Sequence, residues 1–164
     1  MKYLFIIVFV NVFCLYGIEL GFAIDSPIYT HLTYMFQHAS VIHLVMNSIS
    51  FFFLWDLCER RIGRLHTIGI TITSALLASF VSAEELPTVG ASGMIYALIG
   101  VCLSHEVYKW IKEKKIVNEA LIIAAGVLLG MLFSAFSETS NTMLHAAAML
   151  LGYLFAYSLR LFRT

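Results

Sequence analysis

Six apolar runs, separated by short polar connections, restrict what this sequence can fold into. Each run approaches the roughly 20 residues that an α-helix needs to cross a bilayer. Hydrophobic residues make up 60% of the 164 and charged residues only 12%, which is more apolar surface than a soluble domain of this size can bury. The runs lie near residues 3–23, 40–57, 65–82, 90–108, 116–136 and 142–161.

The runs predict an all-α, polytopic membrane protein with six spans in a single domain over residues 1–164. Helices are expected because every backbone polar group in lipid must be satisfied within its own segment. The first run could instead be a signal peptide, since Lys2 precedes it. It is long for that role and lacks a good small-residue cleavage pattern, so we interpret it as a first span that stays in the mature protein.

Basic residues fall on one side of the predicted six-span topology. All ten Lys and Arg lie at the amino terminus, in the second and fourth connections, or at the carboxy terminus. The other connections carry acids such as Asp25, Glu84, Glu85 and Glu138. By the positive-inside rule, both termini are predicted to be cytoplasmic.

Charge, cysteines and histidines exclude several classes of site. A net charge of zero offers no basic face, so no nucleic-acid partner is expected. Cys14, Cys58 and Cys102 form no C-x-x-C, and we interpret all three as buried packing residues. No histidine belongs to an H-E-x-x-H pattern, and His66 and His105 are expected near the opposite membrane face from the site described next. No metal and no cofactor is predicted.

Three polar residues on different predicted helices share one depth. Ser92, His145 and His43 each lie 15 to 17 residues from the charged residue that anchors the inner end of the same helix. At 1.5 Å per residue this is roughly 22 to 26 Å above the inner interface, a few Å below the outer surface of an apolar layer about 30 Å thick. Polar groups at such depth mark a functional site or a satisfied interhelical hydrogen bond.

A serine and a histidine at equal depth meet the first requirement of nucleophilic catalysis, a hydroxyl within reach of an imidazole. Taken alone, Ser92 is more often a packing serine and His145 a hydrogen-bonded core residue. Tyr96 lies one turn from Ser92, and its ring could hold the imidazole. His43 and Asn47, four residues apart, could stabilise an oxyanion together with the Ser92 N–H. An interhelical polar clamp is the alternative.

Small residues recur on two of the predicted helices. They are Gly93, Ala97 and Gly100 in the fourth run, and Ala148, Gly152 and Ala156 in the last. Such small-xxx-small patterns let membrane helices approach closely. The pattern therefore predicts that the last helix packs against the fourth, which would bring His145 to Ser92.

Motifs in three of the runs resemble those of a known family. The fourth run opens with G-x-S-G at Gly90 to Gly93, and the second run has the spacing histidine, four residues, histidine, three residues, asparagine. "ERRIG" ends the second run, and the last run carries His145 followed by Gly152. From about residue 31 to the carboxy terminus, the chain resembles the rhomboid intramembrane serine proteases in their basic six-span form.

The resemblance implies a rhomboid-like bundle of six transmembrane helices that hydrolyses peptide bonds in or near the transmembrane segments of membrane proteins. Its partners would be single-span substrates and the lipid bilayer, in a bacterial inner membrane, with the site near the outer face. By the same resemblance, Ser92 is the nucleophile and His145 the base of a catalytic dyad. The other site residues are His43, Asn47 and the Ser92 N–H as oxyanion hole, with Tyr96, Gly90, Gly93 and His38 in supporting positions.

Two departures from the family pattern and two alternative functions accompany this interpretation. Ala148 stands where the family often has glycine, and the first loop, residues 24–40, lacks the family's Trp-Arg pair, so its membrane-lying hairpin is expected to be reduced. One alternative is a non-catalytic rhomboid-like chaperone or client-binding protein, which typically lacks the serine or the histidine. The other is a processing protease with a single kind of client.

Overall fold

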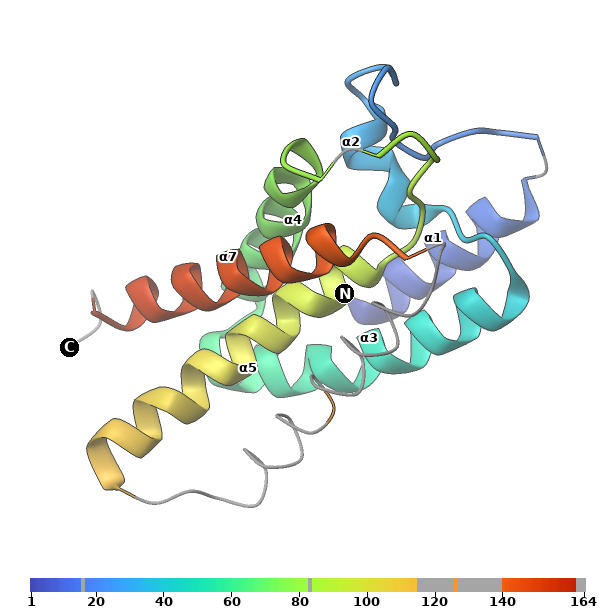
Figure 1. The fold of residues 1–164 in the computed structure, drawn as a ribbon. Coiled ribbons are helices and arrows are strands. Elements are labelled where there is room, and N and C mark those ends of the chain that lie inside the picture. Colours follow the sequence, from blue (N-terminus) through green and yellow to red (C-terminus); the bar gives the residue numbers. More distant parts are fainter. Residues whose placement is uncertain (16, 83, 115–125, 127–139, 162–164) are drawn as a thin grey trace.

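Helices form the regular structure of the chain (Figure 1). The computed structural model describes residues 1–15, 17–82, 84–114, 126 and 140–161. Across this described part, the one β pairing is an isolated antiparallel bridge between Phe22 and Thr88, so the all-α prediction is confirmed there. The elements are α1 (Lys2–Cys14), α2 (Thr30–Thr33), the 3-10 helix η1 (Tyr34–Phe36), α3 (Val41–Ile62), α4 (Arg64–Phe80), α5 (Ser92–Glu113) and α7 (Thr142–Leu161).

The first helix is shorter than predicted. α1 ends at Cys14, well before the predicted end at residue 23. Gly17 has φ of 84°, a left-handed conformation that does not continue a helix. Beyond it, the N–H of Leu20 donates to Oε1 of Gln37 at 2.8 Å, so this apolar stretch joins the loop structure instead.

The other described helices match their predicted runs more closely. α4 and α7 agree closely with their predicted bounds, whereas α5 extends past its predicted end at residue 108 to Glu113. α3 begins where the Ser40 hydroxyl accepts the N–H of His43, and it extends beyond the predicted end to Ile62, where Gly63 with φ of 84° stops it. The predicted span 116–136 and Glu138 lie outside the described residues.

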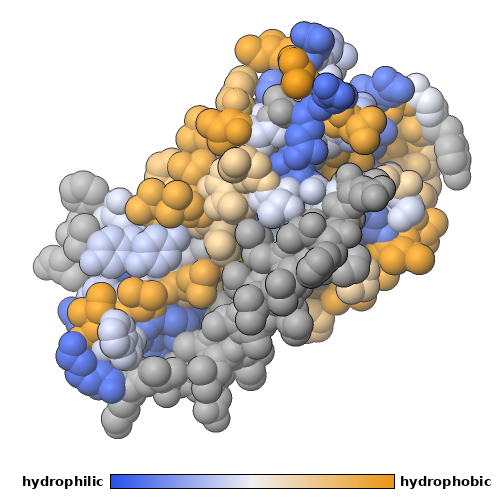
Figure 2. All heavy atoms as spheres, viewed as in Figure 1, coloured by the Kyte–Doolittle hydropathy of each residue, from blue (hydrophilic) through white to orange (hydrophobic). Residues whose placement is uncertain are grey.

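The exposed surface of the described helices is strongly apolar. Figure 2 shows several hydrophobic patches between hydrophilic ones on the face in view, and Ile42 and Leu65 are 78% and 80% exposed. In the described part, α3 and residues Thr142–Arg160 of α7 are long and apolar enough to cross a membrane. Extended apolar surface of this kind suits a lipid surrounding rather than water.

α5 is the central helix of the fold and contacts α3, α4 and α7, while α1 packs on α3 (Figure 1). Its contact with α7 is made backbone to backbone. A Cβ added at Gly100 would collide with the carbonyl oxygen of Met149, and one at Gly152 would collide with that of Ala97. Ala148, one turn before Gly152 on α7, is fully buried, so the alanine in the place of a family glycine still lies inside the packed bundle.

A buried polar cluster joins α3 to α5 at the end of the bundle far from Ser92. The Arg61 guanidinium lies 2.7 Å from a carboxylate oxygen of Glu106, and both side chains are less than 10% exposed. Such a pair holds two helices in register, because removal of one partner would leave the other charge buried and unpaired.

The prediction that all three cysteines are buried is wrong for one of them. Cys58 and Cys102 are fully buried, with their sulfur atoms 3.6 Å apart between α3 and α5. Cys14 is exposed. Phe5 and Phe9 of α1 are buried and Phe13 packs partly against the core, whereas Cys14, the last residue of the helix, is exposed.

Candidate active site

A serine and a histidine meet where α5 and α7 begin. Ser92 is the first residue of α5, and His145 is in the first turn of α7. The Ser92 Oγ lies 2.8 Å from Nε2 of His145. His145 is buried and Ser92 is half-buried, so the hydroxyl is held by the protein yet can still be reached. A neutral imidazole accepting this hydrogen bond is arranged to take the serine proton.

Two glycines allow the chain to bring Ser92 to this position. Gly90 has φ of 120°, and a Cβ there would lie 2.7 Å from the ring of His43. A Cβ at Gly93 would lie 2.5 Å from the phenolic oxygen of Tyr34. A side chain at either position would force the ring of His43 or Tyr34, or the start of α5, to move, and at Gly90 it would also be strained by the positive φ.

Tyr96 lies against the imidazole. Its ring is stacked on that of His145, with centroids 4.3 Å apart and planes 17° from parallel. Because Tyr96 follows Ser92 by four residues on α5, one helix face presents both the hydroxyl and the ring that restrains its histidine partner. Stacking restricts the imidazole plane, and so keeps Nε2 directed at the hydroxyl.

Hydrogen-bond donors lie on α3 beside Gly90. The Asn47 amide nitrogen is buried and has no hydrogen-bond partner among the described residues. A Cβ at Gly90 would lie 3.3 Å from this nitrogen, so the amide faces the backbone just before Ser92. The His43 ring borders the same backbone. A buried donor without a partner is costly unless a bound group pairs it, and a developing oxyanion is such a group.

His38 contacts the backbone between Gly90 and Ser92. Its Nε2 accepts the N–H of Ala91 at 3.4 Å, and its ring packs edge-on against His43 with centroids 5.3 Å apart. Burial, together with the nearby His43, lowers the pKa of His38 to about 4. The ring is therefore neutral at pH 7 and keeps a lone pair for this contact.

Asn141 is a residue of this region that the sequence interpretation missed. It is buried and precedes α7, where its Oδ1 accepts the N–H of Leu144 at 2.8 Å as a helix N-cap. An asparagine directly before an apolar run is the sequence signal for such a cap. Asn141 stands one turn before His145.

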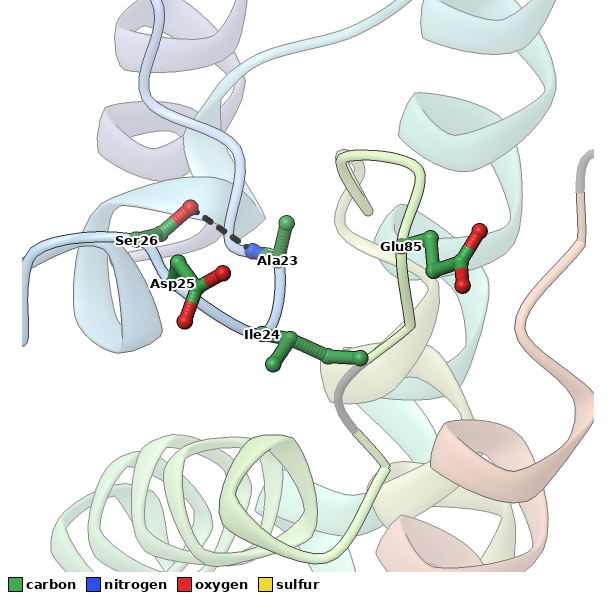
Figure 3. A pocket seen from close by; sticks show the side chains of 5 residues that line it. All are labelled: Ala23, Ile24, Asp25, Ser26 and Glu85. Atoms are coloured by element: carbon green, nitrogen blue, oxygen red, sulfur yellow. Dashed lines mark hydrogen bonds between the residues drawn. The ribbon is translucent and has the colours of Figure 1, made fainter.

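A separate open pocket lies at the loops that follow α1 and α4 (Figure 3). It is lined by Ala23, Ile24, Asp25, Ser26 and Glu85. Figure 3 shows the two carboxylates on opposite sides of Ile24, so they do not converge on one point. In the ranges that the structure covers, no group of three or more His, Cys, Asp or Glu could hold a metal ion.

Comparison with known proteins shows which proteins the chain is similar to. Rhomboid protease GlpG of Salmonella choleraesuis (strain SC-B67) is 26% identical over 139 residues, which cover 79% of this chain and 48% of that protein. Proteins of the same name from Salmonella newport (strain SL254) and Salmonella heidelberg (strain SL476) match to the same extent. The chain spans about half the length of the curated relatives it matches.

A family model matches the chain from the loop after α1 to its carboxyl end. The model of the rhomboid domain matches residues 25–162, which include every residue of the candidate site. A rhomboid domain is a bundle of membrane helices, in agreement with the apolar surface of α3 and α7. The resemblance seen in the sequence is confirmed: this chain is an integral membrane protein that belongs to the rhomboid family.

Proposed function

We propose that this chain is a serine endopeptidase that cleaves peptide bonds in or near the transmembrane segments of membrane-protein substrates. The observation that carries this function is the 2.8 Å contact between the Ser92 hydroxyl and His145 Nε2 at the mouth of two apolar helices. Residues 1–164 act as one domain, and single-span helices in the surrounding bilayer are the substrates.

The reaction follows from the atoms around Ser92. His145 Nε2 takes the hydroxyl proton while Oγ attacks the scissile carbonyl carbon. The Asn47 amide, the His43 ring and the Ser92 N–H at the start of α5 stabilise the oxyanion. His145 then gives its proton to the leaving amine, and water hydrolyses the acyl-enzyme. Tyr96 keeps the imidazole plane oriented through both proton transfers.

Labelling with a fluorophosphonate tests this function directly. The solubilised protein is expected to be acylated at one serine, and both Ser92→Ala and His145→Ala should abolish the label. Ser158→Ala is a matched control, because this exposed serine on α7 donates only to the Leu154 carbonyl. Equal labelling of wild type and Ser92→Ala would rule out Ser92 as the nucleophile.

The proposed orientation has both termini in the cytoplasm of a bacterial cell and the site near the outer face of the inner membrane. It rests on α5, which begins at Ser92 and carries Lys112 at its opposite end, and on the acids Glu84 and Glu85 in the loop before Ser92. Basic residues favour the cytoplasmic side.

A cysteine scan measures this orientation. In a Cys14→Ala background, which removes the exposed native thiol, a cysteine at Glu84 should react with an impermeant maleimide applied to intact cells. A cysteine at Lys112 should react only after permeabilisation. The reverse pattern would place Ser92 on the cytoplasmic side.

A further inference from the structure

We propose that Asn141 is a positioning residue that holds His145 in register with Ser92 by tying the first turn of α7 to the segment leading into α5. This role rests on the proposed serine protease function. The Asn141 side chain makes its hydrogen bonds to Ser82, Thr88 and Leu144 rather than to Ser92, so it would act through the placement of the histidine.

The Asn141 side chain uses both its amide nitrogen and its carbonyl oxygen in hydrogen bonds. It is 4% exposed. Its amide nitrogen donates to the Ser82 carbonyl oxygen at 2.6 Å and to Thr88 Oγ1 at 3.1 Å, while its Oδ1 accepts the N–H of Leu144. A buried amide with both donors and its acceptor engaged has one orientation, so it fixes α7 against the loop between α4 and α5.

The two ends of this link lead directly to the two reacting groups. On one side, the main-chain oxygen of Asn141 accepts the N–H of His145 at 3.2 Å, which places both in one helical turn. On the other, Thr88 lies four residues before Ser92 and is itself held by paired backbone hydrogen bonds with Phe22, of 2.8 and 3.2 Å.

The hydrogen bonds of Asn141 therefore hold the first turn of α7, which carries His145, against the segment that leads to Ser92. The helices α5 and α7 pack closely further down, at Gly100 and Gly152. Without the hydrogen bonds from Asn141 to Ser82 and Thr88, the first turn of α7 could rotate or fray while the packing at Gly100 and Gly152 is kept. A misplacement of about 1 Å between reacting groups can cost about 10²-fold in rate.

Capping and positioning can be separated by the choice of substitution. Serine is as good an N-cap as asparagine, so Asn141→Ser keeps an acceptor for the Leu144 N–H. It lacks the amide donors to Ser82 and Thr88. Asn141→Ala removes both functions, and Thr88→Val removes one acceptor from the opposite side of the link.

The experiment measures fluorophosphonate acylation, and kcat and KM for a single-span substrate, with the full chain in proteoliposomes below its unfolding temperature. Asn141→Ser and Asn141→Ala should both lower the acylation rate and kcat by about 10²-fold with KM unchanged. Thr88→Val should lower them less. If Asn141→Ser fails to fold, Thr88→Val still tests the positioning role, because it leaves the cap at Asn141 intact.

Three results would overturn this role. Wild-type rates in Asn141→Ser would show that Asn141 is only a cap, and wild-type rates in Thr88→Val would show that the link to Thr88 positions nothing. A raised KM with unchanged kcat would assign Asn141 to substrate binding. Absence of acylation in the wild type is a different failure, because it overturns the proposed protease function and this role with it.

Discussion

Replacing either Ser92 or His145 by alanine is expected to abolish turnover of a single-span substrate, with a loss on the order of 10⁴ to 10⁶-fold in kcat. The double variant should be hardly slower than either single one. The reason is that His145 Nε2 activates the Ser92 hydroxyl through their contact. Without the imidazole the hydroxyl is not deprotonated, and without the hydroxyl the imidazole has no nucleophile to activate. Initial cleavage rates in proteoliposomes measure the effect.

His66→Ala is the matched control for the histidine substitution. His66 is exposed on α4, in the first turn of that helix, and does not belong to the site. Its replacement should leave turnover within about twofold of wild type, as for most exposed positions away from a site. Losses in Ser92→Ala and His145→Ala that multiply in the double variant would mean that the two residues act independently, against a dyad.

Replacing Asn47 by alanine is expected to lower kcat by about 10² to 10³-fold, with little change in KM. The Asn47 amide is buried without a partner in the described part of the chain, and it faces the backbone just before Ser92. It can therefore pair with an oxyanion that forms only in the transition state, and this is the pattern that changes kcat. Steady-state kinetics on the reconstituted substrate measure it.

Asn11→Ala serves as the control for this amide, because Asn11 is exposed on α1 and its side chain donates to the Ile7 carbonyl. His43→Ala should also slow turnover, and the losses in both variants should be smaller if the Ser92 N–H supplies most of the oxyanion stabilisation. Unchanged turnover in both Asn47→Ala and His43→Ala would assign these two residues to a structural clamp between helices.

The sequence led to Ser92, His145 and Tyr96 because each constraint on them is local. The depth of a residue in a span follows from its distance to a charged end, and a face follows from a spacing of four. Small residues then indicate which helices meet. The structure brings these three side chains together, while their catalytic roles stay predictions.

The features that sequence reasoning missed depend on contacts between distant segments. Hydropathy continues past Cys14, so the apolar pattern alone does not show that the helix ends there, and Gly17 is the one local signal. The bond from Leu20 to Gln37 joins residues too far apart in the sequence to be read from it. Asn141 has a local signal only as a cap. Its bonds to the loop before Ser92 become visible only when α7 is placed beside that loop.

The backbone contact between α5 and α7 also limits how this chain can change during evolution. Gly100 and Gly152 touch no substrate, yet a side chain at either position must separate the helices that carry Ser92 and His145. Trimming a facing side chain would not relieve the collision, because the colliding atoms are main-chain carbonyls that every amino acid shares. A larger residue at either position would therefore change the geometry between the first turns of α5 and α7, although neither glycine lies at the site itself.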